Sequence, residues 1–221
     1  MASYGLGPAT LLDDVRPLLR GWLHAATVPI AVVAAVLVAM RAPAHLRLAV
    51  AVYGVTTVLI FSTSAIYHRL AFPTRFRAWW QRADHSAIFL FIVGTYTPVA
   101  VVSTGSRWSW LWLSMIWAVG LIGIVAIWTV GIRPAVNALY GVLGWTGLLV
   151  LWPFVHSAGV AAAVLLIVGG LCYSAGALAS LKHRPDPWPS VFGYHEVFHA
   201  MTLVAAGCQY AAVMIAITRH A

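Results

Sequence analysis

The chain has 221 residues, of which 62% are hydrophobic and only 8% carry a formal charge. Soluble domains average about 45–50% apolar and about 25% charged residues, so the composition excludes a soluble globular protein and predicts an integral membrane protein. The net charge of +8 does not indicate nucleic-acid binding, because the basic residues stand in short groups between apolar segments and form no charged tail.

Seven apolar segments are long enough to cross a bilayer, since a spanning helix needs roughly 20 mostly apolar residues. In chain order we expect them at about residues 22–40, 46–67, 84–103, 108–130, 135–155, 160–181 and 192–217. A basic, aromatic stretch at 69–82 separates the second from the third. The sequence therefore predicts an all-α seven-transmembrane-helix bundle over residues 22–217, between a short N-terminal segment (1–21) and a short tail (218–221).

The N-terminus has a rival interpretation as a cleavable signal peptide. Signal peptides have apolar regions of about 7–15 residues, and the first apolar run here is longer. We therefore expect an uncleaved first span.

Orientation follows from the distribution of Lys and Arg between the two ends of the predicted spans. Nine of these residues stand at the N-terminus or after the second, fourth and sixth spans: Arg16, Arg20, Arg69, Arg75, Arg77, Arg82, Arg133, Lys182 and Arg184. The other side has four: Arg41, Arg47, Arg107 and Arg219. The positive-inside rule then predicts a cytoplasmic N-terminus and an external C-terminus.

Three places in the apolar segments carry polar groups that are costly in a membrane unless they have partners. Ser64 and His68 are four residues apart, Asp84 opens the third apolar segment, and His195 and His199 are again four residues apart. Residues i and i+4 share one helix face. All three places fall at the predicted cytoplasmic end. We therefore predict one shared site, with zinc held by His68, His195 and His199.

Three imidazoles and one open position are typical of a catalytic zinc. Asp84 is the expected carboxylate for an attacking water, and Ser64 the expected hydrogen-bond donor to that water or an oxyanion. Simpler interpretations exist for each residue. Asp84 can cap a helix, Ser64 can bond to its own backbone, and HxxxH alone is a weak metal signal.

The remaining polar residues receive simpler interpretations. Glu196 points off the ligand face by about 100°, so we expect it around the site or at the lipid interface. The other histidines in or beside the spans are expected to reach lipid headgroups: His24, His45, His156 and His183. Both cysteines, Cys172 and Cys208, are expected to be small, buried apolar side chains. His85, beside Asp84, has no assigned role.

The order of these motifs resembles the haemolysin III family, which groups with the progestin and adipoQ receptors and is distantly similar to the alkaline ceramidases. The resemblance rests on four stretches that extend over nearly the whole chain: Arg20-Gly21-Trp22-Leu23-His24, Ser64-x-x-x-His68, Asp84 with Ser86, Gly94, Tyr96, Thr97 and Pro98, and Gly193-Tyr194-His195-Glu196-Val197-Phe198-His199.

The resemblance implies a seven-helix fold with a cytoplasmic N-terminus and a zinc near the cytoplasmic face. His68, His195 and His199 would be the ligands, with Asp84 on the water and Ser64 beside it. It also implies hydrolysis of a lipid amide or ester and a part in membrane-lipid homeostasis. The short loops and tail are typical of a bacterial protein of the inner (plasma) membrane, and a hormone-receptor role is not expected.

Other functions stay open from the sequence. A non-catalytic sensor or receptor would use zinc only to join the spans. A zinc site with four protein ligands and no exchangeable water would favour this function. A pore or transporter is less favoured, because intramembrane charges are few and no internal repeat is visible. Nine histidines also permit haem, although two ligands on one helix face suit an ion better. The sequence predicts no particular oligomeric state.

Overall fold

The computed structural model describes residues 16–103 and 107–220, and these are almost entirely helical. Their helices are α1 (Trp22–Arg41), η1 (Ala44–Leu46), α2 (Arg47–Arg69), α3 (Thr74–Val102), α4 (Arg107–Thr129), α5 (Pro134–Trp145), η2 (Thr146–Val150), α6 (Leu151–Ala158), α7 (Val160–Lys182) and α8 (Tyr194–Thr218). Because α5, η2 and α6 form one continuous span, the described residues contain seven helical units long and apolar enough to cross a membrane. The predicted seven-span fold is confirmed.

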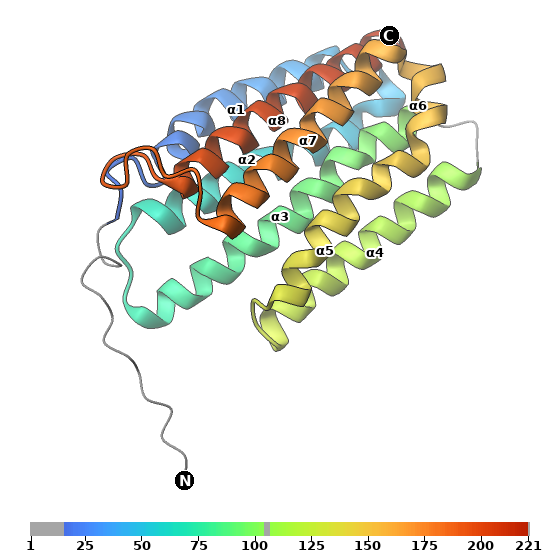
Figure 1. Ribbon diagram of the computed structural model, residues 1–221. Helices are drawn as coiled ribbons and strands as arrows, with labels where there is room; N and C mark the ends of the chain where they lie inside the picture. The colour runs from blue at the N-terminus through green and yellow to red at the C-terminus, as the bar shows by residue number, and fades with distance from the viewer. Residues whose placement is uncertain (1–15, 104–106, 221) are drawn as a thin grey trace.

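The helix α3 is the centre of the bundle (Figure 1). It packs along α2 on one side and α4 on the other, and it also contacts α5, α6 and α8. On the far side of α2 lies α1, and α7 packs along α8. Of the seven spans, α3 is the most buried, so polar side chains on it are held inside the protein.

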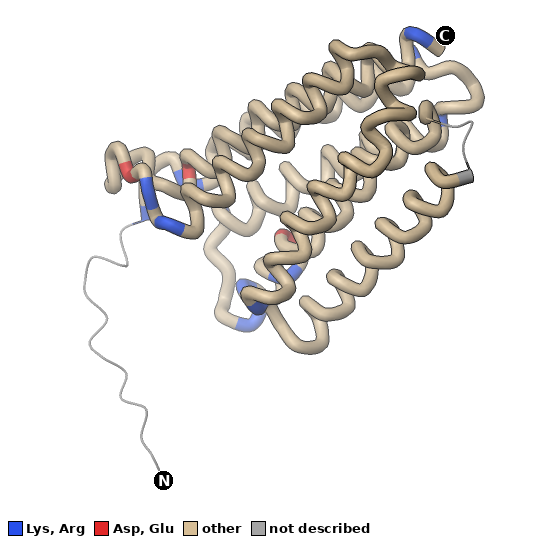
Figure 2. The backbone as a smooth tube through the Cα atoms, turned by 45° about the vertical axis from the view of Figure 1, so that its right-hand side comes forward, with Lys and Arg blue, Asp and Glu red and all other residues tan. Residues whose placement is uncertain are grey.

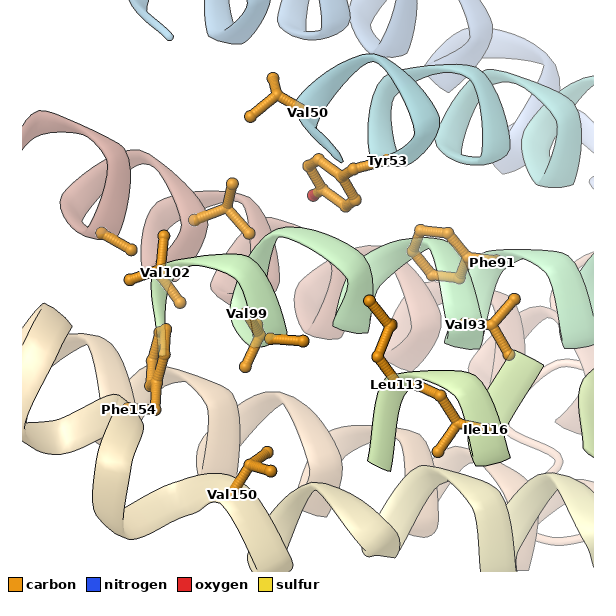
Figure 3. Close-up of a cluster of buried hydrophobic side chains, with 14 of the residues drawn as sticks. Val50, Tyr53, Phe91, Val93, Val99, Val102, Leu113, Ile116, Val150 and Phe154 are labelled. Atoms are coloured by element: carbon orange, nitrogen blue, oxygen red, sulfur yellow. The ribbon is translucent and has the colours of Figure 1, made fainter. Parts of the chain in front are cut away.

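The core is apolar, and so is much of the outer surface. Figure 3 shows part of the core, where side chains from α2, α3, α4, η2 and α6 meet: Val50, Tyr53, Phe91, Val93, Val99, Val102, Leu113, Ile116, Val150 and Phe154. Large apolar side chains such as Met40 and Leu48 are exposed on the outside, as expected of surfaces that face lipid. Because lipid and core are equally apolar, close packing must hold the helices together.

Small residues permit that close packing. A Cβ on Gly94 of α3 would overlap Thr56 Oγ1 of α2, and a Cβ on Gly54 of α2 would lie 2.9 Å from the Ala35 side chain of α1. Both glycines therefore let neighbouring backbones approach more closely than any other residue would allow.

Two predicted spans differ from the structure. The third helix begins at Thr74 and not at Asp84, because Pro73 sets an extended backbone immediately before a sequence that continues as helix. Asp84 therefore lies in the third turn and does not cap the helix. The fifth span is interrupted by η2, since Pro153 has no N–H to donate to the carbonyl one turn earlier.

The described part of the N-terminal segment, residues 16–21, lies against the connection between α7 and α8. Two backbone hydrogen bonds join them, from Leu18 N to Ser190 O at 3.0 Å and from Leu19 N to Val191 O at 3.1 Å. Of the predicted segment 1–21, residues 1–15 lie outside the described residues, as does Ala221 of the tail. The described part of the chain starts and finishes at opposite ends of the bundle, and Figure 2 places the Lys and Arg residues near helix ends.

Candidate metal centre

Three histidines from two helices converge where α2 ends and α8 begins. His68 comes from the last turn of α2, and His195 and His199 come from the first two turns of α8. One nitrogen from each ring can be chosen so that all three lie within 4.8 Å of one another. The structure thus brings together His68 and the HxxxH pair, the three residues that the sequence analysis predicted as metal ligands.

One of the distances between these rings already matches that expected around a metal ion. Two imidazole nitrogens bound to zinc at about 2.05 Å and a tetrahedral angle stand about 3.3–3.4 Å apart. His195 Nε2 lies 3.3 Å from His68 Nε2. His199 is buried, and its Nδ1 has no hydrogen-bond partner among the described residues. Three protein ligands would leave a fourth tetrahedral position open, since the group contains no fourth His, Cys, Asp or Glu from the described residues.

The start of α8 is fixed by two carboxylates. Glu196 Oε2 accepts a hydrogen bond from Gly193 N at 2.9 Å, and Asp186 Oδ1 accepts one from Tyr194 N at 3.0 Å. Both N–H groups belong to the helix N-terminus, where intrahelical acceptors are lacking. These bonds set the position of the first turn, and with it the direction of His195.

Glu196 is also tied to the N-terminal segment. Its Oε1 accepts a charge-assisted hydrogen bond from Arg20 Nε at 2.6 Å, and the glutamate is fully buried. Glu196 therefore points off the ligand face, as predicted, but it lies inside the protein and not at the lipid interface. The sequence did not reveal that Arg20 pairs with Glu196, because the two residues are 176 positions apart in the chain.

A glycine allows the N-terminal segment to pass close to His68. Gly21 has φ of 77°, in the left-handed region, and a Cβ at this position would lie 2.7 Å from His68 Cβ. Glycine adopts that backbone conformation without steric cost. The close approach of Gly21 therefore helps to fix the end of α2 from which His68 extends.

Asp84 and Ser64 form a second polar group beside the histidines. Asp84 is buried on α3, and its carboxyl group lies near the Ser64 side chain of α2. Asp84 is not a member of the ligand group. The neighbouring His85 has its Nδ1 3.8 Å from Asp84 Oδ2, but that nitrogen is closer to Gln81 O, at 2.9 Å.

Ser64 does not bond back to its own helix in the way nearby hydroxyls do. Thr57 and Thr63 donate to backbone carbonyls of α2. Ser64 Oγ instead lies 2.8 Å from His24 Nδ1.

His24 is the residue of this site that sequence reasoning missed. It was expected to reach lipid headgroups, and this expectation is wrong: the side chain is buried and stacks on His199, with ring centroids 3.9 Å apart and planes 5° apart. His24 shares the inward face of α1 with Ala31 and Val38, seven and fourteen positions later. Because α1 is apolar all round, its sequence does not reveal this face. His45, His156 and His183, in contrast, are exposed.

Comparison with known proteins shows the family of this chain. A family model described as Haemolysin-III related matches residues 13–210. The chain is 27% identical to Hemolysin-3 of Bacillus cereus over 165 residues, which are 74% of this chain and 72% of that protein. It is 26% identical to the Hemolysin-3 homolog of Bacillus subtilis (strain 168), over 74% of each chain. It is also 31% identical over 133 residues to the heptahelical transmembrane protein ADIPOR2 of Oryza sativa subsp. japonica, covering 58% of this chain and 49% of that one. With seven helical spans and a family match over most of its length, this chain belongs to the haemolysin-III-related family of multi-pass membrane proteins.

Proposed function

We propose that this protein is a zinc-dependent hydrolase that cleaves an amide or ester bond of a lipid within a bacterial inner membrane and contributes to membrane-lipid homeostasis. The observation that carries this proposal is the division of the site into two parts. His68, His195 and His199 form a three-ligand group with room for a fourth ligand, and Asp84 is a separate buried carboxylate. A metal held only for structure has no need of such a carboxylate.

The chemistry divides between the ion and the side chains. A bound zinc ion would supply Lewis acidity, which polarises a carbonyl and makes water more acidic. Asp84 would orient the attacking water and take its proton at a carboxylate oxygen. The carbonyl carbon gains a bond to the water oxygen and loses its bond to the amide nitrogen or ester oxygen. That leaving group then takes the proton from Asp84.

The position of the site suits a lipid substrate. The histidine group lies where one span ends and another begins, near the end of the bundle. Amide and ester linkages of membrane lipids lie just below the headgroups, so a substrate need not leave the bilayer. The excess of Lys and Arg at this end supports a cytoplasmic N-terminus and a site in the inner leaflet.

One observation favours a second candidate, a zinc-stabilised sensor. The ligands come from α2 and α8, which make few close backbone approaches to each other, so an ion would join two otherwise separate helices. In that case zinc would contribute to the stability of the bundle and no lipid would be turned over.

The test compares zinc content and lipid turnover in the purified protein and three variants. We expect His199→Ala to lose zinc and turnover together. Asp84→Asn should keep zinc and lose turnover of a ceramide-like amide or a phospholipid ester. His156→Ala, which changes an exposed histidine, is the matched control and should alter neither.

Each outcome decides between the candidates. Full turnover by Asp84→Asn refutes the hydrolase mechanism. A wild-type protein that holds zinc but releases no product from either class of lipid favours the sensor. Equal zinc in wild type and His199→Ala refutes the metal assignment altogether.

A further inference from the structure

His24 links the two parts of the candidate site. Its Nδ1 lies 2.8 Å from Ser64 Oγ, and its Nε2 lies 3.1 Å from Thr202 Oγ1. One face of the ring stacks on His199, and the Phe61 ring meets it edge-on at 5.2 Å. Both ring nitrogens are therefore occupied by hydroxyl groups, so His24 is not a fourth metal ligand in this arrangement.

The hydrogen-bond network assigns the protons around His24. The Thr202 hydroxyl donates its proton to the backbone oxygen of His199, at 2.7 Å. Thr202 Oγ1 therefore has only lone pairs left for His24, and Nε2 must carry the proton of that bond. His24 is 4% exposed and has no carboxylate partner among the described residues, so a neutral ring avoids an unpaired buried charge.

The tautomer of His24 determines what Ser64 can do. In a neutral ring with the proton on Nε2, Nδ1 is an acceptor, and the Ser64 hydroxyl must donate to it. The hydroxyl proton is then committed to His24, and Ser64 Oγ presents only lone pairs toward Asp84. Ser64 therefore cannot act as the oxyanion donor that the sequence predicted.

We propose that His24 is a positioning residue of this site: it fixes Ser64 Oγ as a hydrogen-bond acceptor facing Asp84, and its ring braces His199. The inference rests on the proposed hydrolase function. When Asp84 has taken the proton of the attacking water, Ser64 Oγ accepts a hydrogen bond from the carboxyl O–H. This bond holds the proton on Asp84 until the leaving group takes it.

The two roles of His24 are separated by two substitutions. His24→Phe keeps an aromatic ring against His199 but has no ring nitrogen, whereas His24→Ala removes the ring as well. Thr202→Val is a milder change that removes the acceptor of the Nε2 proton. His45→Phe, at an exposed histidine, is the control for the His-to-Phe exchange itself.

Three measurements are made on each folded variant: kcat and KM for a ceramide-like amide in lipid vesicles, the zinc Kd by competition with a chelator, and the visible spectrum after replacement of zinc with cobalt(II). We expect His24→Phe to lower kcat by about 10–100-fold with little change in KM or zinc Kd, as is typical when an outer-shell partner is lost. His24→Ala should in addition raise the zinc Kd about tenfold and shift the cobalt spectrum. Thr202→Val should lower kcat by a smaller factor.

A double variant tests whether His24 acts through Ser64. Ser64→Ala and His24→Phe should lower kcat by similar factors, and the two combined should be no worse than either alone. Multiplied effects would overturn the proposal, as would wild-type kcat in His24→Phe. If His24→Phe does not fold, Thr202→Val decides: unchanged kcat in that variant overturns the proposal too.

Failure of this inference is distinguishable from failure of the proposed function. If wild type hydrolyses the lipid and His24→Phe matches it, only the role of His24 is refuted. If wild type binds zinc but hydrolyses nothing, the hydrolase function and the Ser64 role both fail, and the His24→Ala and His24→Phe zinc affinities still test the bracing of His199. If wild type binds no zinc, both proposals are refuted.

Discussion

The ion pair between Arg20 and Glu196 gives a sharp prediction for stability. Replacing Arg20 with Met removes the cation and keeps a long apolar side chain. Glu196 would then hold a carboxylate in a fully buried position, with Gly193 N as its remaining hydrogen-bond donor. An unpaired charge inside a protein is strongly unfavourable, so the loss should be much greater than for a surface salt bridge.

The structure sets the size of the effect. Breaking a buried pair by removing one partner costs about 3–5 kcal/mol. The Arg20 side chain is 22% exposed and that of Glu196 only 1%, so water screens the cation more than the anion. The lower end of the range, about 3 kcal/mol, is therefore expected. For a chain of this size this corresponds to a drop in Tm of roughly 6–12 °C.

The assay is the fraction of protein that remains folded after heating in detergent, measured by size-exclusion chromatography. Arg75→Met, which removes an exposed arginine with no carboxylate partner among the described residues, is the matched control and should change stability by less than about 0.5 kcal/mol. Adding Glu196→Gln to Arg20→Met should recover part of the loss, because no unpaired charge then stays buried. An Arg20→Met protein as stable as Arg75→Met would refute this prediction, as would a double variant less stable than the single one.

Three further predictions concern close packing and the metal. Gly21→Ala places a Cβ 2.7 Å from His68 Cβ at a φ of 77°, so the zinc Kd measured by chelator competition should rise at least tenfold; an unchanged Kd contradicts this. Gly94→Ala makes a Cβ overlap Thr56 Oγ1 and should lower the free energy of unfolding by about 1–3 kcal/mol, with partial recovery on adding Thr56→Ala; a fully stable Gly94→Ala protein argues against this contact. Removal of metal with a chelator should lower the Tm of wild type and leave that of His199→Ala unchanged, because a ligand that binds only the folded state stabilises it; equal shifts would count against the site.

The sequence alone determined the number of spans and indicated all three histidines of the candidate metal group. Length and apolarity define a membrane helix almost completely, because every backbone polar group must be satisfied within the helix. The spacing of His195 and His199 placed both on one helix face before any coordinates existed. The distribution of Lys and Arg placed His68 at the same end of the bundle as this pair.

Only the tertiary structure decided which other polar residues surround the candidate metal group. In α1 both the lipid face and the protein face are apolar, so periodicity does not tell whether His24 points inward or outward. The pairing of Arg20 with Glu196 joins residues 176 positions apart, and it depends on how the N-terminal segment lies over the start of α8. Helical periodicity reports the environment of a face only when the two sides of the helix differ in polarity. In a membrane they do not, so contacts between distant segments decided the surroundings of the site.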